Sequence, residues 1–202
     1  MNGGDYYHFV TDPSGNIGIA IADVIGKGIP AALAMSMIKY SLDSFPDALQ
    51  TPSIILENLN RVVERNVHSS MFITMFYGLF HPSTGLFQFS SAGHEPGFYY
   101  SAENDKFHEI KTNGLLLGVS NSAIYEQCDI EMKIGDMVIL LTDGVTECRV
   151  NDQFIETNEI LDVIRKYMHL PAQEAVELVY RHFERLQGFH LRDDFTLIFM
   201  KK

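Results

Sequence analysis

Four aspartates in this 202-residue sequence share one setting, because each lies where an apolar segment meets a turn. They are Asp5 in "GGDYY", Asp23 in "IADVIGKG", Asp143 in "LLTDGVTE" and Asp193 in "RDDFTLI". Any one of them alone is explained as a turn or strand-end residue, since aspartate is a common turn former. Taken together, four carboxylates at the ends of apolar strands indicate a shared chemical role.

Burial makes a metal site the best physical account of these carboxylates. A buried charge is costly unless it is paired or bound to a metal. Basic partners are few, because no Lys or Arg follows Asp143 before Arg149, and Arg192 beside Asp193 cannot neutralise four sites. Aspartates without histidine or cysteine companions are hard oxygen ligands, which suit Mg²⁺ or Mn²⁺ better than Zn²⁺. The pattern therefore predicts a carboxylate cluster that holds divalent metal ions.

Such a cluster would support hydrolysis without a protein nucleophile. Two neighbouring ions lower the pKa of a bridging water and neutralise phosphoryl oxygens, so that the hydroxide attacks phosphorus in line. The sequence has no Cys-x5-Arg loop, no G-x-S-x-G elbow and no P-loop lysine motif. These observations favour metal-dependent hydrolysis of a phosphorylated substrate.

Composition restricts the other possibilities. The net charge of −11 argues against a nucleic-acid groove, which needs an excess of Lys and Arg. Bound cations would still allow a phosphorylated substrate. No apolar run approaches the roughly 20 residues of a membrane span, and no signal segment opens the sequence. The two cysteines lack metal-ligand spacing and are typical of structural thiols in a reducing cytoplasm, which is the predicted location.

The first elements are predicted from apolar periodicity and turn residues. Strands are expected at 6–10 and 17–23, and the second is apolar on both faces. A helix is expected at 30–42, and because Lys39 is its only charge, most of its circumference should be buried. A second helix should begin with Thr51 as its cap. Its predicted inner stripe is Ile55, Leu59 and Val62.

A β-rich middle and two further helices complete the prediction. Strands are expected at 71–80, 86–93, 97–101, 107–111, 125–132 and 135–144. Helices are expected at 160–168 and 171–186, the latter with Ala175, Val179, Phe183 and Leu186 inward, followed by a strand at 193–200. Short turns between neighbouring strands favour antiparallel sheets, and two separate helix pairs favour a layered α/β arrangement.

Six segments in this order resemble the SpoIIE-like bacterial branch of the metal-dependent PPM (type 2C) serine/threonine phosphatases. They are "GGDYYHF", "IADVIGKGIPAALAMSMIK", "MFITMFY", "SAGHEPGFYY", "GDMVILLTDGVTEC" and "DDFTLI". The resemblance covers essentially the whole sequence. It implies a four-layer α-β-β-α sandwich of two mainly antiparallel sheets flanked by helix pairs, with residues 1–202 as a single domain.

The resemblance also assigns ligands to two ions, Mn²⁺ or Mg²⁺. It implies that Asp23 bridges both ions and that the Val24 carbonyl completes the first site. Asp143 and Asp193 would hold the second ion, and Asp5 would bind the first ion or its water.

Further residues of the matching motifs receive supporting roles from the same resemblance. Asp194 is expected to be a helper or structural group, and Gly26 and Gly28 let the loop after Asp23 turn tightly. His94 in "SAGHEP" has two interpretations: it donates a proton to the leaving serine oxygen, or it holds its loop by hydrogen bonding. The structural interpretation is favoured.

The implied activity is that of a phosphoserine/phosphothreonine protein phosphatase in bacterial general stress signalling. Its implied substrate is a phosphorylated anti-sigma-factor antagonist, a small STAS-domain protein. Family members carry an additional strand, a linker helix and a regulatory domain before "GGDYY", so we expect a catalytic fragment with low basal activity. We expect the fragment to be monomeric and the full-length protein dimeric, with an activator that acts through the upstream region. The first two helices are where the family's activating movement is expected to act.

Two other classes of function remain open at this stage. A metal-dependent nuclease or phosphodiesterase would also use an aspartate cluster, although the charge of −11 and the lack of a basic stripe count against it. A non-catalytic module that binds a phosphoprotein is the other alternative. The presence of all four aspartates argues against it.

Overall fold

Two antiparallel sheets organise the chain, and each belongs to one of two compact units. The first unit contains Met1–Glu95 and Lys111–Lys133, and the second contains Pro96–Ile110 and Ile134–Lys202. The computed structural model describes residues 4–26, 28–44, 51–67, 71–150, 153–188 and 194–202. Within these ranges, no helix combines the length and the apolar character needed to cross a bilayer.

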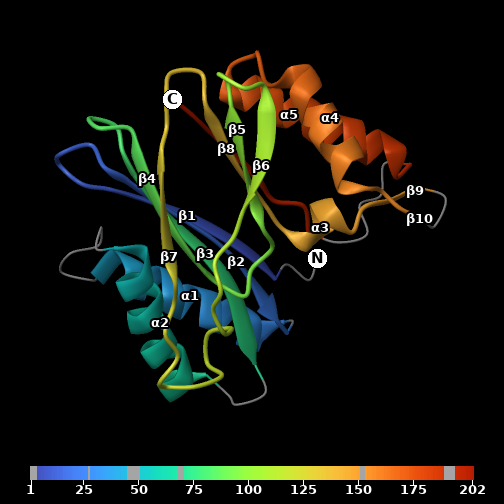
Figure 1. Ribbon diagram of the computed structural model, residues 1–202. Helices are drawn as coiled ribbons and strands as arrows, with labels where there is room; N and C mark the ends of the chain where they lie inside the picture. The colour runs from blue at the N-terminus through green and yellow to red at the C-terminus, as the bar shows by residue number, and fades with distance from the viewer. Residues whose placement is uncertain (1–3, 27, 45–50, 68–70, 151–152, 189–193) are drawn as a thin grey trace. The chain divides into compact units, whose positions relative to one another are not determined.

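The first unit is a five-stranded sheet with two helices packed on one face (Figure 1). The spatial order is β1-β2-β3-β4-β7, and every neighbouring pair is antiparallel. The strands are β1 Asp5–Thr11, β2 Ile17–Ile25, β3 Phe72–His81, β4 Leu86–Ala92 and β7 Gln127–Glu131. The helices are α1 Ile29–Ser44 and α2 Pro52–Asn66. Strand β2 is therefore paired on both sides.

The hairpin of β1 and β2 follows from its turn residues. The Asp12 carboxylate accepts hydrogen bonds from the Asn16 backbone N–H at 2.9 Å and from Asn16 Nδ2 at 2.8 Å. Gly15 has φ 81°, a left-handed conformation that glycine adopts without steric cost. The predicted strands at 6–10 and 17–23 are confirmed, and each is slightly longer than expected.

Helix α1 is less buried than its composition suggested. Ile38 and Leu42 are buried in a core shared with α2, β2 and β3. Ile29, Leu33 and Tyr40, however, are 77%, 64% and 74% exposed. The prediction that most of the circumference is buried is therefore wrong, because only one side of the helix contacts the core.

Helix α2 begins at the predicted position but differs in two details. The Thr51 carbonyl accepts the backbone N–H groups of Ile54 and Ile55, whereas the Thr51 side chain makes no capping hydrogen bond. The inner stripe includes Val63 rather than Val62, which is half-buried. The helix is thus rotated slightly from the predicted phase.

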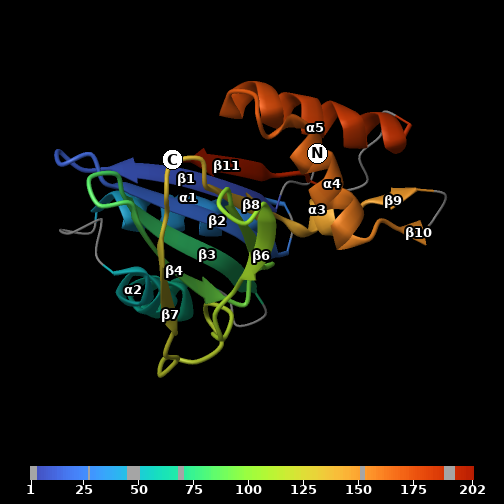
Figure 2. The ribbon, with the colours of Figure 1, turned by 45° about the horizontal axis from the view of Figure 1, so that its top comes forward.

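The second unit has a four-stranded sheet in the order β11-β8-β5-β6 and a separate β9-β10 pair. The strands are β5 Gly97–Ser101, β6 Lys106–Ile110, β8 Met137–Leu141, β9 Arg149–Val150, β10 Gln153–Phe154 and β11 Leu197–Lys201. The helices are α3 Asp143–Thr146, α4 Thr157–Tyr167 and α5 Ala172–Leu186. Figure 2 shows α4 and α5 side by side, with α5 also in contact with β11.

The second unit confirms the main elements and corrects smaller ones. Ala175, Val179 and Phe183 of α5 are buried as predicted, whereas Leu186 is 41% exposed. The elements α3, β9 and β10 were not predicted, since two to four residues are too few to show periodicity. Strand β11 begins at Leu197, so the predicted strand is wrong for residues 194–196, and residue 193 lies outside the described residues. The expected fold class, two mainly antiparallel sheets with helix pairs, is confirmed.

Candidate metal centre

The β1–β2 register brings two of the predicted ligands together. Asp5 and Asp23 are paired Cα partners on the neighbouring antiparallel strands. Directly opposite residues share one face of a sheet, with Cβ atoms about 4.5–5.5 Å apart, and like charges in this position repel each other. Both residues are half-buried, so water screens the repulsion incompletely. A divalent cation near the pair would relieve it.

The absence of a side chain at Gly4 lets the Asp23 carboxylate lie close to the backbone just before β1. A Cβ atom built on Gly4 would lie 2.5 Å from Asp23 Oδ1 and 3.2 Å from the Val24 carbonyl oxygen. Any side chain at position 4 would therefore occupy the region that these two oxygens border. A carboxylate and a main-chain carbonyl are both hard oxygen donors, which fit Mg²⁺ or Mn²⁺. The residues on this side of the predicted site thus fit the expected metal.

Two glycines lie between β2 and the body of α1, at positions 26 and 28. Gly26 has φ 157° and Gly28 has φ 76°, conformations that residues with a Cβ atom rarely adopt. The Gly28 carbonyl then accepts the Ala32 N–H within the first turn of α1. Both backbone conformations favour glycine at these two positions after Asp23.

A hydrogen-bonded chain of side chains lies on the other side of Asp23. Thr74 is the Cα partner of Asp23 on β3, and its hydroxyl lies 3.4 Å from the Asp23 carbonyl oxygen. The same hydroxyl lies 2.9 Å from His94 Nδ1. His94 is 8% exposed, and its backbone N–H donates to Ser91 Oγ at 3.2 Å.

Asp143 lies in the second unit, at the end of the fully buried strand β8. It is the first residue of α3, and its carbonyl accepts the Glu147 N–H at 2.6 Å. A Cβ atom on Gly144 would overlap the carbonyl oxygen of Asp194. The absence of a side chain at position 144 therefore lets the segment that carries Asp194 pass directly beside α3. This places the backbone of Asp194, a predicted structural group, next to the residue that follows Asp143.

Two hydrogen bonds fix this approach between β8 and β11. The Thr142 N–H donates to the Thr196 carbonyl at 3.2 Å, and the Thr196 N–H donates to Thr142 Oγ1 at 3.1 Å. Thr142 is fully buried. The Thr142 hydroxyl thus takes the place of a backbone acceptor for the Thr196 N–H, at the point where the pairing of β8 with β11 ends.

The structure describes three of the four predicted aspartates. Asp5 and Asp23 lie together with the Val24 carbonyl in the first unit, and Asp143 lies in the second. Asp193 lies outside the described residues. In the described part of the chain, no three His, Cys, Asp or Glu side chains form a group able to hold a metal ion.

Sequence reasoning did not single out Gly4, Thr74 or Gly144. The sequence offered a clue for two of them, because Gly4 precedes Asp5 in "GGDYY" and Gly144 follows Asp143. Thr74 lies in the middle of an apolar strand, and only the register of β3 with β2 reveals that it faces Asp23.

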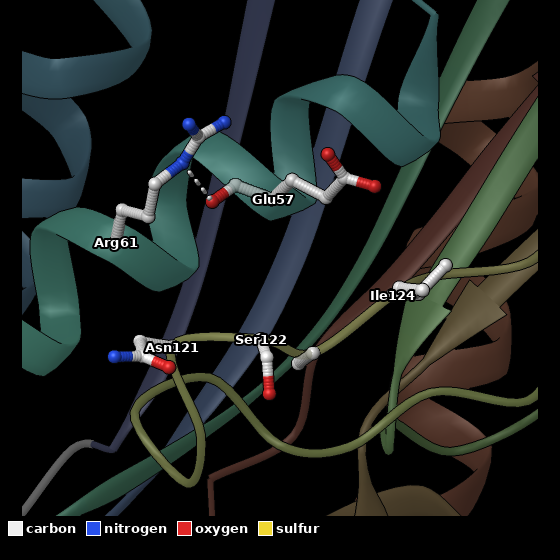
Figure 3. A pocket seen from close by; sticks show the side chains of 6 residues that line it. Glu57, Arg61, Asn121, Ser122 and Ile124 are labelled. Atoms are coloured by element: carbon white, nitrogen blue, oxygen red, sulfur yellow. Dashed lines mark hydrogen bonds between the residues drawn. The ribbon is translucent and has the colours of Figure 1, made fainter.

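A hollow in the first unit lies between α2 and the segment that precedes β7 (Figure 3). Its volume is about 250 Å³, and it is lined by Glu57, Arg61, Asn121, Ser122, Ala123 and Ile124. Arg61 Nε donates to the Glu57 carbonyl at 3.2 Å, and a second nitrogen of the guanidinium donates to Asn58 Oδ1 at 2.8 Å. None of the predicted ligands lines this hollow, so it is separate from the candidate metal centre.

Comparison of the sequence with known proteins identifies its family. The profile of the stage II sporulation protein E (SpoIIE) family matches residues 13–202. The chain is 52% identical to phosphoserine phosphatase RsbU of Bacillus subtilis over 199 residues, which is 98% of this chain and 59% of RsbU. The chain thus spans less than two thirds of the length of that relative.

Solved structures agree on the fold. The SiaA PP2C domain of Pseudomonas aeruginosa superposes with a TM-score of 0.84 at 20% identity, covering 100% of this chain and 81% of that one. RsbX in complex with magnesium superposes with a TM-score of 0.67 at 19% identity, covering 98% of this chain and 86% of that one. The resemblance noted in the sequence is confirmed. The chain belongs to the SpoIIE family and has the fold of PP2C-type phosphatases.

Proposed function

We propose that this domain is a metal-dependent protein phosphatase that removes phosphate from phosphoserine or phosphothreonine. The observation that carries the proposal is the arrangement at the end of β2. There Asp5 and Asp23 are paired across two strands, and Asp23 Oδ1 and the Val24 carbonyl oxygen both lie within 3.2 Å of one point beside Gly4. The 52% identity to a protein named phosphoserine phosphatase supports the same activity.

The proposal assigns ligands to two ions of Mn²⁺ or Mg²⁺. Asp23 would contact both ions, with Asp5 and the Val24 carbonyl at the first, and Asp143 and Asp193 at the second. The ions would neutralise phosphoryl oxygens and supply a water of lowered pKa for in-line attack. The RsbX structure, which contains magnesium, supports the choice of a hard divalent cation.

The chain's own residues would fix the ligands in place. The pairing of β1 with β2 holds Asp5 opposite Asp23, and pairing on both sides of β2 limits movement of the Asp23 backbone. The hydrogen bonds between Thr142 and Thr196 anchor the start of α3, where Asp143 lies. Fixed ligands reduce the reorganisation needed when charge develops on the phosphoryl group.

The proposed substrate is a phosphorylated STAS-domain anti-sigma-factor antagonist in bacterial general stress signalling. The similarity to RsbU supports this assignment. As part of the same proposal, the domain acts in the cytoplasm, which is in agreement with its two free cysteines. An activator would act through a preceding region and the first two helices, with a dimeric full-length protein. The exposed apolar residues Ile29, Leu33 and Tyr40 on α1 support an interaction there, since large apolar patches often mark contact surfaces.

The test is phosphate release from a phosphoserine STAS-domain protein with Mn²⁺. The enzyme is in excess over substrate, so that a low basal rate is still measured. We expect wild-type release to depend on Mn²⁺, and Asp23→Asn and Asp143→Asn to lose it. Asp162→Asn is the matched control, because Asp162 is an exposed residue of α4. Release without metal, or retention of the wild-type rate by either site variant, would contradict the proposal.

A further inference from the structure

A row of three polar residues crosses the first sheet at the candidate metal centre. Asp23 on β2 is paired with Asp5 on β1 and with Thr74 on β3. Directly opposite residues in antiparallel strands point to the same face. Thr74 is therefore the neighbour of Asp23 on the side away from Asp5.

The peptide group between Asp23 and Val24 is contacted at both ends. Its N–H, on Val24, donates to the Gly4 carbonyl at 3.2 Å. Its carbonyl oxygen, on Asp23, accepts a hydrogen bond from the Thr74 hydroxyl, with 3.4 Å between the two oxygens. Because a peptide group is planar, contacts at both ends fix its orientation. That orientation sets the directions of both candidate ligands, the Asp23 carboxylate before it and the Val24 carbonyl after it.

The Thr74 hydroxyl is itself held by His94. A threonine hydroxyl has one proton to donate and two lone pairs that accept. If that proton points to the Asp23 carbonyl, the 2.9 Å contact with His94 requires Nδ1–H to donate to Thr74 Oγ1. This orientation of the Thr74 hydroxyl therefore goes with the His94 tautomer that carries hydrogen on Nδ1.

The backbone around His94 is fixed to the same strand. Gly93 forms a β-bridge with Met75, the residue after Thr74. The His94 N–H donates to Ser91 Oγ, and the imidazole is almost completely buried. His94 is therefore held in place by its own loop when it contacts Thr74.

We infer that Thr74 and His94 are positioning residues that orient the Asp23–Val24 peptide toward the metal. This inference rests on the proposed function and deepens it. It selects the structural role of His94 in "SAGHEP", acting through Nδ1, over proton donation to the leaving group. It also assigns a role to Thr74, which pairs with Asp23 only in the folded sheet.

The test is calorimetric titration of each variant with Mn²⁺ alone, together with thermal unfolding of the metal-free protein. Thr74→Val keeps the shape but removes the hydroxyl, and we expect a Kd for Mn²⁺ about three- to tenfold higher, as for loss of one hydrogen bond. Thr74→Ser keeps the hydroxyl and should restore affinity. Thr11→Val, at the exposed end of β1, is the matched control and should bind as the wild type does.

A second pair of variants keeps the inference testable if Thr74→Val does not fold. In His94→Asn the amide nitrogen replaces Nδ1, and we expect nearly wild-type affinity for Mn²⁺. In His94→Gln the amide lies near the position of Nε2, and we expect the weaker affinity of Thr74→Val.

The outcomes separate this inference from the proposed function. Wild-type affinity in Thr74→Val, or equal weakening in both His94 variants, would overturn the positioning role while the proposed function stands. Equal weakening in Thr11→Val would also overturn it, because the effect would then be general. A wild-type protein that binds no Mn²⁺ would overturn the proposed function and this inference together.

Discussion

Replacing Gly4 by alanine separates the function of the metal centre from the stability of the fold. The added methyl group would lie 2.5 Å from Asp23 Oδ1, whereas ordinary contacts of a Cβ atom begin at 3.4 Å. The carboxylate must therefore move by about 0.9 Å or rotate away, since atoms do not overlap in packed interiors. The Val24 carbonyl, at 3.2 Å, needs to shift by only a few tenths of an ångström.

We expect this change to affect activity far more than stability. The atom that must move most is a side-chain oxygen rather than a backbone atom, and Gly4 does not have the left-handed φ that disfavours alanine. Alanine also restricts the unfolded chain, which stabilises by about 0.4–1 kcal/mol and offsets the local crowding. A ligand displaced by about 1 Å can lower the rate about 100-fold. Gly4→Ala should therefore unfold near the wild-type temperature and lose about 100-fold in rate.

The assay measures Mn²⁺-dependent phosphate release and thermal unfolding on the same samples. Gly15→Ala is the opposite control, because no atom lies near its added Cβ but its φ is 81°. We expect Gly15→Ala to lose about 1 kcal/mol of stability, the cost of left-handed backbone, and to keep its activity. Wild-type activity in Gly4→Ala would refute the argument that activity depends on the position of the Asp23 carboxylate beside Gly4.

Three further changes test the packing and electrostatics of the fold. Asn60 is 1% exposed, and its side-chain amide donates to the Ser120 carbonyl and accepts the Gly118 N–H. Asn60→Ala should therefore lower the free energy of unfolding in urea by about 2–3 kcal/mol. A loss below about 0.5 kcal/mol would contradict these hydrogen bonds. Phe183→Ala on α5, whose side chain is fully buried, should cost about 3–5 kcal/mol, and a loss typical of a surface site would show that the α5 core is misplaced. Hydrogen bonds from Lys39, and to a lesser extent from His8, lower the pKa of Asp43 in the folded protein. The ionised Asp43 carboxylate therefore stabilises the fold above the usual aspartate pKa of about 3.9, and this stabilisation fades as the pH falls through the lower pKa of the folded state. Urea unfolding across this pH range should show a small deficit for Asp43→Asn near neutral pH that disappears in acid, and a deficit that grows in acid would contradict the sign.

The strands that carry the aspartates could be predicted because local pattern determines them. Apolar periodicity and the turn residues Pro13 and Gly15 were enough to predict β1 and β2, and an apolar run predicted β8. The prediction of a metal site came from residue types alone, since buried carboxylates at apolar strand ends are costly without a cation. Each of these predictions needed only the residues of one short, continuous segment.

Pairing across the sheet could not be predicted in the same way. That Asp5 and Thr74 flank Asp23 depends on register, which spacing along the chain does not specify. The close approach of Asp23 to Gly4 also depends on how β1 and β2 are assembled. Such features emerge only when the elements are assembled.

Helix α1 shows a different limit of sequence reasoning. Its apolar composition predicted burial, yet Leu33 and Tyr40 are exposed because the core reaches only one side of the helix. Composition records how much apolar surface a helix has, and packing decides which part is covered. In α2, Val63 is buried where Val62 was predicted to be, because two adjacent valines leave the helical phase ambiguous.

The most direct test of the central claim is anomalous diffraction from crystals of this domain soaked in Mn²⁺. The account predicts an anomalous peak within coordination distance of both the Asp23 carboxylate and the Val24 carbonyl. The same soak of Asp23→Asn crystals should lose that peak. A fully soaked wild-type crystal with no peak at Asp23, or with manganese bound only elsewhere, would contradict the account.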